Sequence, residues 1–162
     1  MKENISEKNN RGLVLTLILT HAQKLLLDKH LNDTRFIYNK YVEEYLNCLK
    51  ENKVPNYKDY QELRTKYEFL KGSYSWTLQQ VKFQFLKTNK INRTKRSKSQ
   101  KVGLVRFRSK KSHSDYYVNN IKLSYNTDCK SKSYIRIPKI GLVQFRCKHI
   151  KPELLKVRLS LE

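Results

Sequence analysis

Carboxylates are scarce in the second half of this 162-residue sequence. Residues 73–162 carry four Asp and Glu against 22 Lys and Arg, whereas residues 1–72 carry 10 against 13. Cleavage assisted by two metal ions needs several carboxylates that converge on one point. The four that remain are Asp115, Asp128, Glu153 and Glu162, and no two fall on one face of one predicted strand. The sequence therefore predicts no metal-dependent nuclease centre.

Cysteine, glycine and histidine are also few. The three cysteines, Cys48, Cys129 and Cys147, form no Cys-x-x-Cys pair and no disulfide framework, so we expect buried free thiols and no metal. Four glycines leave no Gly-rich phosphate loop, and none of the four histidines lies near a recognisable nucleophile. We therefore expect neither a cofactor nor an enzyme active site.

Long apolar runs are absent as well. No stretch of 18 apolar residues occurs, and the polar N-terminus has no apolar core of a signal peptide. These two absences argue against a membrane partner. We expect a cytoplasmic protein associated with the nucleoid.

Positive charge is what the sequence has in excess. The formal net charge is +21, and residues 73–162 account for +18 of it. A small folded protein with this charge repels itself unless a polyanion neutralises it. Nucleic acid is the expected partner, and the second half of the chain should carry most of the contact surface.

The first half has mostly helical periodicity. Residues 12–19 are apolar and β-branched and predict a buried strand, and Thr20 is a candidate N-cap for the helix that follows. Asn32, Asp33 and Thr34 predict either a turn that divides residues 21–52 into two helices or a kink within one helix, and we expect the turn. Two further helices are expected, one over residues 57–71 and one that begins near residue 73 and ends near residue 92.

After residue 101 the period changes from 3.6 to 2. Strands are predicted at residues 102–108, 116–125, 133–138, 141–146 and 154–161. The predicted fold is α+β, a small closed antiparallel barrel or sandwich with an inserted bundle of three to four helices. Its barrel would comprise residues 12–20 and 102–162, its helical lobe residues 21–92, and its basic connector residues 93–101. The first strand should return to pair with the later strands.

Basic and aromatic residues are the remaining candidates for a binding surface. Residues 92–111 are rich in Lys and Arg and contain no carboxylate. In a strand, Arg106 and Arg108 would face a phosphate backbone while Val105 and Phe107 are buried; the alternative is a half-buried strand with ordinary charged outer positions. Most of the eleven tyrosines lie at helical spacing typical of a core, whereas Tyr116 and Tyr117 are candidates for stacking on bases.

Three stretches together resemble the TnpB (OrfB) family of transposon-associated proteins. The first resembles the family's Arg-Phe-[Ile/Val]-Tyr-Asn run, here residues 35–39 after a strand and a capped helix. The second, residues 105–111, resembles a Pro-Arg-Phe-Lys-x-Lys segment, with Val105 in place of proline and Arg108 in place of lysine. The third, residues 137–143, resembles a Leu-Pro-Lys-Leu-Gly-x-[Val/Ile] strand pair.

The resemblance implies the binding half of an RNA-guided nuclease. In that family a barrel with an inserted recognition lobe holds a guide RNA and the duplex that flanks the target, while a separate RuvC-like domain with a zinc ribbon cuts. We accordingly expect guide-like RNA and double-stranded DNA as partners, with any cleavage supplied by a separate nuclease half. The candidate nucleic-acid-binding residues are Arg35, Tyr38, Asn39, Arg93, Lys95, Arg96, Lys98, Lys101, Arg106, Arg108, Lys110, Lys111, Tyr116, Tyr117 and Lys139.

Two other functions stay open. A stand-alone helix-turn-helix regulator would place a helix over residues 33–50 in the major groove of DNA. A basic structural protein of ribosomal or nucleoid type would bind without regard to sequence.

Overall fold

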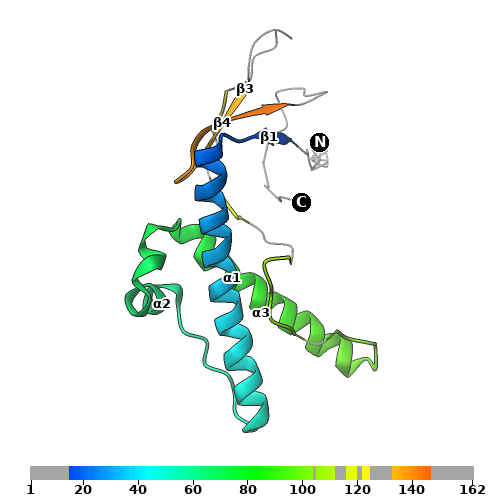
Figure 1. The fold of residues 1–162 in the computed structure, drawn as a ribbon. Coiled ribbons are helices and arrows are strands. Elements are labelled where there is room, and N and C mark those ends of the chain that lie inside the picture. Colours follow the sequence, from blue (N-terminus) through cyan, green and yellow to red (C-terminus); the bar gives the residue numbers. More distant parts are fainter. Residues whose placement is uncertain (1–14, 104, 112–115, 120–121, 125–132, 147–162) are drawn as a thin grey trace, which may run out of the picture.

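The computed structural model describes residues 15–103, 105–111, 116–119, 122–124 and 133–146. These residues form an α+β fold in which three helices lie in sequence between the first strand and the other three (Figure 1). The order is β1 (Thr16–Ile18), α1 (His21–Lys50), α2 (Tyr60–Lys66), the 3-10 helix η1 (Glu68–Gly72), α3 (Ser75–Ser97), β2 (Lys122–Ser124), β3 (Ser133–Ile137) and β4 (Gly141–Arg146).

The four strands form one antiparallel sheet in the order β1-β4-β3-β2. Strand β1 pairs with β4, with Leu17 opposite Phe145, so the predicted return of the first strand to the later ones is confirmed. Strands β3 and β4 are joined by a tight turn in which the Ile140 N–H donates to the Ile137 carbonyl at 3.1 Å. Pro138 and Lys139 occupy its centre, and Lys139 has φ of 66°, the positive value that a type II turn needs at its third position.

The predicted closed barrel or sandwich is wrong. Over the described residues the sheet is open, with β1 and β2 at its edges, and its strands are three to six residues long. The described parts of residues 102–108 form no strand, and residues 116–119 precede β2 without pairing in the sheet. The strand predicted at residues 154–161 lies outside the described part of the chain. Without a strand at residues 102–108, too few paired segments remain to close a barrel.

Helix α1 is continuous for 30 residues, so the predicted turn near residue 33 is wrong. The side chains expected to break it make bonds that a helix tolerates. The Thr34 hydroxyl donates to the Leu31 carbonyl at 2.8 Å, and the Asp33 carboxylate accepts a hydrogen bond from Ser73. The predicted cap is confirmed, because the Thr20 hydroxyl accepts from the Gln23 N–H while the Gln23 side chain accepts from the Thr20 N–H.

The next two helices differ from prediction at their ends. A capping box of Asp59 and Glu62 starts α2 three residues later than expected, and the following turn tightens into η1. Helix α3 continues through Ser97, so much of the predicted basic connector is helical. The apolar spacing of residues 76–86 fits a buried face at Leu78, Val81 and Phe85, which are buried, whereas Trp76 is 37% exposed and Leu86 is 38% exposed.

Two apolar cores lie along α1. The first joins Leu27 to the inner face of the sheet, where Ile135, Val143 and Phe145 are buried. The second lies among α1, α2 and α3 and contains Ile37, Tyr41, Val42, Leu63, Leu70, Leu78, Val81 and Phe85. Helix α1 runs from the sheet at one end to the helical cluster at the other, and α3 crosses it (Figure 1). The end of α3 therefore lies away from the sheet.

Candidate nucleic-acid interface

Helix α3 carries six Lys and Arg and no Asp or Glu. The described ion pairs join Lys40, Lys53, Lys71 and Lys82 to carboxylates, and all of these lysines precede residue 83. No Lys or Arg from residue 87 to residue 111 forms an ion pair with a carboxylate in the described part of the chain. Charges of one sign without such partners are available to an external anion.

We call the eight exposed cations at the end of α3 and just after it the basic surface. Its members are Arg93, Lys95, Arg96, Lys98, Lys101, Arg106, Lys110 and Lys111. The chain leaves α3 and turns back along the helices, so the basic surface belongs to the helical part of the molecule (Figure 1). The expectation that a barrel wall carries Arg106, Lys110 and Lys111 is wrong, because residues 105–111 form no strand.

Asn39 attaches the segment after α3 to helix α1. Its side-chain amide donates to the Arg108 carbonyl at 3.0 Å, and its side-chain oxygen accepts from the Arg108 N–H at 2.8 Å. The pair of bonds satisfies both backbone groups of Arg108, as a neighbouring strand would. Two of the three stretches that carry the family resemblance, residues 35–39 and 105–111, thus contact each other directly.

Arg108 and Val105 complete this attachment. The Arg108 guanidinium lies 3.9 Å from the centre of the Tyr38 ring and forms a cation–π contact within the protein. It is therefore less available to an external ligand. Val105 packs against the helical core. Phe107, expected to be buried, is 56% exposed because the segment is not part of a sheet. Arg106 is exposed, so of the two arginines it is the one free to face a ligand.

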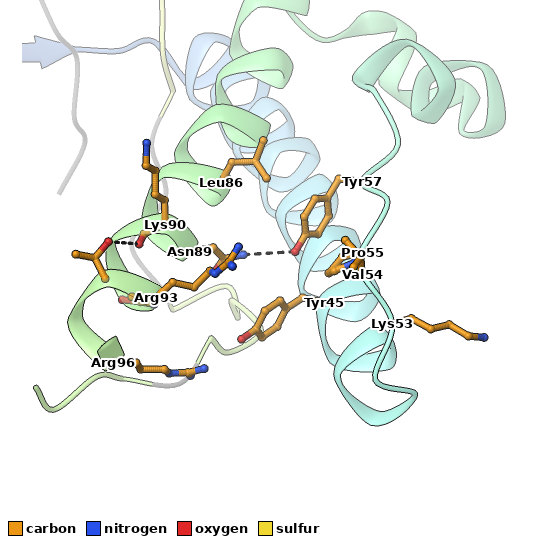
Figure 2. A pocket seen from close by; sticks show the side chains of 12 residues that line it. Tyr45, Lys53, Val54, Pro55, Tyr57, Leu86, Asn89, Lys90, Arg93 and Arg96 are labelled. Atoms are coloured by element: carbon orange, nitrogen blue, oxygen red, sulfur yellow. Dashed lines mark hydrogen bonds between the residues drawn. The ribbon is translucent and has the colours of Figure 1, made fainter. Parts of the chain in front are cut away.

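A hollow of about 820 Å³ opens beside the basic surface, between the end of α3 and the loop after α1. It is lined by Tyr45, Lys53, Val54, Pro55, Tyr57, Leu86, Asn89, Lys90, Asn92, Arg93, Thr94 and Arg96. None of these described lining residues is a carboxylate. Arg93 and Arg96 extend from α3 toward the side where Tyr45 and Tyr57 lie, whereas the Lys53 side chain points away (Figure 2). The hollow thus combines aromatic rings with two guanidinium groups.

Tyr57 is fixed in the wall of this hollow. Its ring packs edge-on against Phe85, with the ring centres 5.3 Å apart, and its hydroxyl lies 3.5 Å from the Asn89 amide nitrogen. Burial raises the pKa of Tyr57 above its ordinary value, and the protonated hydroxyl has both donor and acceptor capacity.

Several predicted residues lie outside this region. Tyr116 is only 2% exposed, stacks on His30 and donates its hydroxyl to the Pro138 carbonyl at 3.0 Å, so it is a core residue rather than a platform for a base. Tyr117 is half-buried, and its carbonyl accepts from Thr77. Arg35 bonds to Asn32 within α1. Lys139 is exposed in the β3–β4 turn, at the sheet end of the molecule.

The sequence reasoning missed the hollow. Tyr45 has the spacing of a core residue and does pack on Phe85, while Tyr57 was predicted to begin a helix and instead lies in the loop before α2. The one sequence signal near it was the absence of carboxylates between Glu68 and Asp115.

Comparison with known proteins found no match for this chain, either among family models or among curated proteins. Among the described residues no group of three or more His, Cys, Asp or Glu could hold a metal ion. None of the described helices has the length and apolar character needed to cross a membrane.

Proposed function

We propose that this protein binds nucleic acid through the basic surface and the hollow beside it. The single observation that carries the proposal is a hollow lined by two tyrosines and two inward-pointing arginines, with no carboxylate among its lining residues. Phosphates need cations, and bases need flat apolar partners. A solvated charged helix face would need neither the rings nor the hollow.

The family resemblance extends the proposal to a guide-like RNA and to the duplex DNA that an RNA-guided complex engages. Support comes from Asn39 and Arg108, which join two of the resembling stretches into one unit. In this proposal the chain is a binding module, and cleavage would require a separate nuclease half.

The first experiment measures binding of the full chain to labelled RNA and DNA by fluorescence anisotropy at a series of salt concentrations. Each phosphate neutralised should contribute roughly −0.7 to −0.9 to the slope of log affinity against log salt. The variant Arg93→Glu with Arg96→Glu should bind much more weakly and show a shallower slope. A flat salt dependence of the unmodified protein would contradict the proposal.

A matched control tests whether position matters as well as total charge. The variant Lys24→Glu with Lys66→Glu changes the net charge equally, but its exposed side chains lie in α1 and α2, outside the basic surface. It should retain most of the affinity. Equal losses in the two double variants would mean that binding is diffuse and that the basic surface is no site.

The second experiment sequences the RNA that copurifies with the protein. One discrete structured RNA is expected for a guide-binding module. Bulk cellular RNA would favour a basic structural protein, and RNA-free protein that shifts one defined duplex would favour a DNA-binding regulator.

A further inference from the structure

We infer that the hollow binds one unpaired nucleotide, with its base against the rings of Tyr45 and Tyr57 and its phosphates near Arg93 and Arg96. This inference rests on the proposed function and adds the form of the ligand. The preferred ligand is a single strand, or a loop or bulge, rather than a continuous duplex.

The aromatic wall is already in place in the free protein. Tyr45 and Tyr57 both pack edge-on against Phe85, with ring centres 6.5 Å and 5.3 Å away and interplanar angles of 77° and 73°. Phe85 is only 3% exposed and belongs to the helical core. Because the core holds these rings, a base that stacks on them meets a rigid surface and little side-chain freedom is lost on binding.

The polar side chains of the hollow suit both the phosphate and the base of a nucleotide. Guanidinium groups bind phosphate oxygens through paired hydrogen bonds, and Arg93 and Arg96 lie one turn apart on α3, three residues from each other. Asn89 and Asn92 add amide groups, which can both donate to and accept from a base edge. The volume of about 820 Å³ falls within the ordinary range for small-ligand sites, roughly 300 to 1,000 Å³.

The rings of Tyr45 and Tyr57 favour a single-stranded ligand over a duplex. In a continuous duplex each base is stacked on its neighbours, so its flat face is covered and only its edge is presented in a groove. An unpaired base exposes the face that an aromatic side chain needs. A duplex could still contact Arg93 and Arg96, but it would leave Tyr45 and Tyr57 unused.

The experiment compares three labelled ligands on the full chain by anisotropy. These are a short single-stranded RNA, the same RNA with abasic positions at its centre, and a blunt duplex of the same sequence. The abasic strand retains every phosphate, so it isolates the contribution of the bases. We expect the intact single strand to bind roughly tenfold more tightly than the abasic strand, as the loss of one stacked base implies.

Tyr45→Leu removes a ring from the hollow but keeps an apolar side chain against Phe85. It should reduce affinity for the intact strand by roughly tenfold and leave affinity for the abasic strand unchanged. Tyr60→Leu is the matched control, because Tyr60 also packs on the helical core but does not line the hollow. Ultraviolet crosslinking of the unmodified protein to the single strand, followed by mass spectrometry, should place adducts on Tyr45 or Tyr57 and needs no variant to fold.

The outcomes separate this inference from the proposed function. Salt-dependent binding with equal affinity for intact and abasic strands, or with crosslinks confined to residues outside the hollow, would overturn the nucleotide site and leave nucleic-acid binding standing. Equal or tighter binding of the blunt duplex would do the same. Absence of salt-dependent binding to any of the three ligands would overturn both.

Discussion

At the scale of single residues, Asn39 gives the segment after α3 a fixed position. Its amide satisfies the N–H and the carbonyl of Arg108, 69 positions further along the chain. The contact does for one residue what a strand would do for several. It thereby brings the Arg108 guanidinium over Tyr38 and leaves Arg106 exposed.

We expect Asn39→Leu to release residues 105–111 from α1. Two part-buried hydrogen bonds are lost, so the free energy of unfolding should fall by about 1–3 kcal/mol. Hydrogen exchange at the Arg108 amide should accelerate, whereas Asn47→Ala, a change at an exposed position of the same helix, should not affect it. Unaltered protection of Arg108 in Asn39→Leu would show that another contact holds the segment.

A second residue-scale feature is the buried hydrogen-bond chain of His30, Ser73 and Asp33. His30 Nδ1 lies 3.0 Å from the Ser73 hydroxyl, which donates to Asp33, while His30 Nε2 is buried without a partner among the described residues. Burial lowers the pKa of His30, although Asp33 opposes this, and burial raises the pKa of Asp33. Burial therefore shifts the protonation equilibrium of both groups toward the neutral form.

The lowered pKa of His30 predicts a stability that falls with acidity. Below the ordinary pKa of about 6.5 the unfolded chain binds a proton that folded His30 resists, so the free energy of unfolding should drop as pH falls from 7.5 to 5.5. Asp33, with its raised pKa, contributes in the opposite sense. Urea unfolding at several pH values measures how steeply the free energy of unfolding depends on pH. This dependence should be less steep for His30→Asn, because the Asn side chain keeps a donor toward Ser73 and does not titrate in this range. Equal slopes would assign the pH dependence to another group.

At the scale of elements, α1 connects the sheet to the helical core, and two sets of hydrogen bonds hold its first turn in place. Thr20 and Gln23 form the capping box, and the Gln23 amide also donates to the Leu142 carbonyl of β4 at 2.7 Å. The cap therefore determines where the helix begins and how it meets the sheet.

Thr20→Ala should lower the free energy of unfolding by about 1 kcal/mol, because one N–H in the first turn loses its acceptor. Thr65→Ala is the control within α2, where the hydroxyl bonds to the Gln61 carbonyl of its own helix and alanine is at least as good a helix former. Chemical denaturation of both variants measures the difference. Similar losses in the two would mean that the cap contributes nothing of its own.

At the scale of the whole molecule, the net charge of +21 is a cost that the folded state carries. The described carboxylates form ion pairs with few of the cations. The Lys and Arg side chains from residue 87 to residue 111 form no ion pair with a described carboxylate. Repulsion among these charges is strongest in the compact state and is screened by salt.

The melting temperature should therefore rise when sodium chloride is increased from low to near-physiological concentration. The variant Arg93→Gln with Arg96→Gln, which removes two of the unpaired charges, should gain less from the same salt. Differential scanning calorimetry measures both effects. A melting temperature that falls with salt would mean that attractive pairs outweigh the repulsion.

Much of the helical part could be predicted from local pattern. The spacing of Leu78, Val81 and Phe85 identifies the buried face of α3, and Thr20 identifies the start of α1, because helix periodicity and caps depend on neighbouring residues alone. The β3 and β4 strands follow from alternation around Pro138 in the same way. The continuous α1 was missed because Asp33 is satisfied by Ser73, a residue 40 positions away.

The sequence by itself determined the charge, the scarcity of carboxylates and most of the helices and strands, since each is a property of composition or of nearby residues. Tertiary structure alone decided that the sheet is open, that residues 105–108 lie on α1 instead of in a strand, and that Tyr116 is buried. It also decided that Tyr45 and Tyr57 meet Arg93 and Arg96 across one hollow. An alternating segment becomes a strand only if a neighbouring strand supplies hydrogen bonds, and here the Asn39 side chain supplies two of them, both to Arg108.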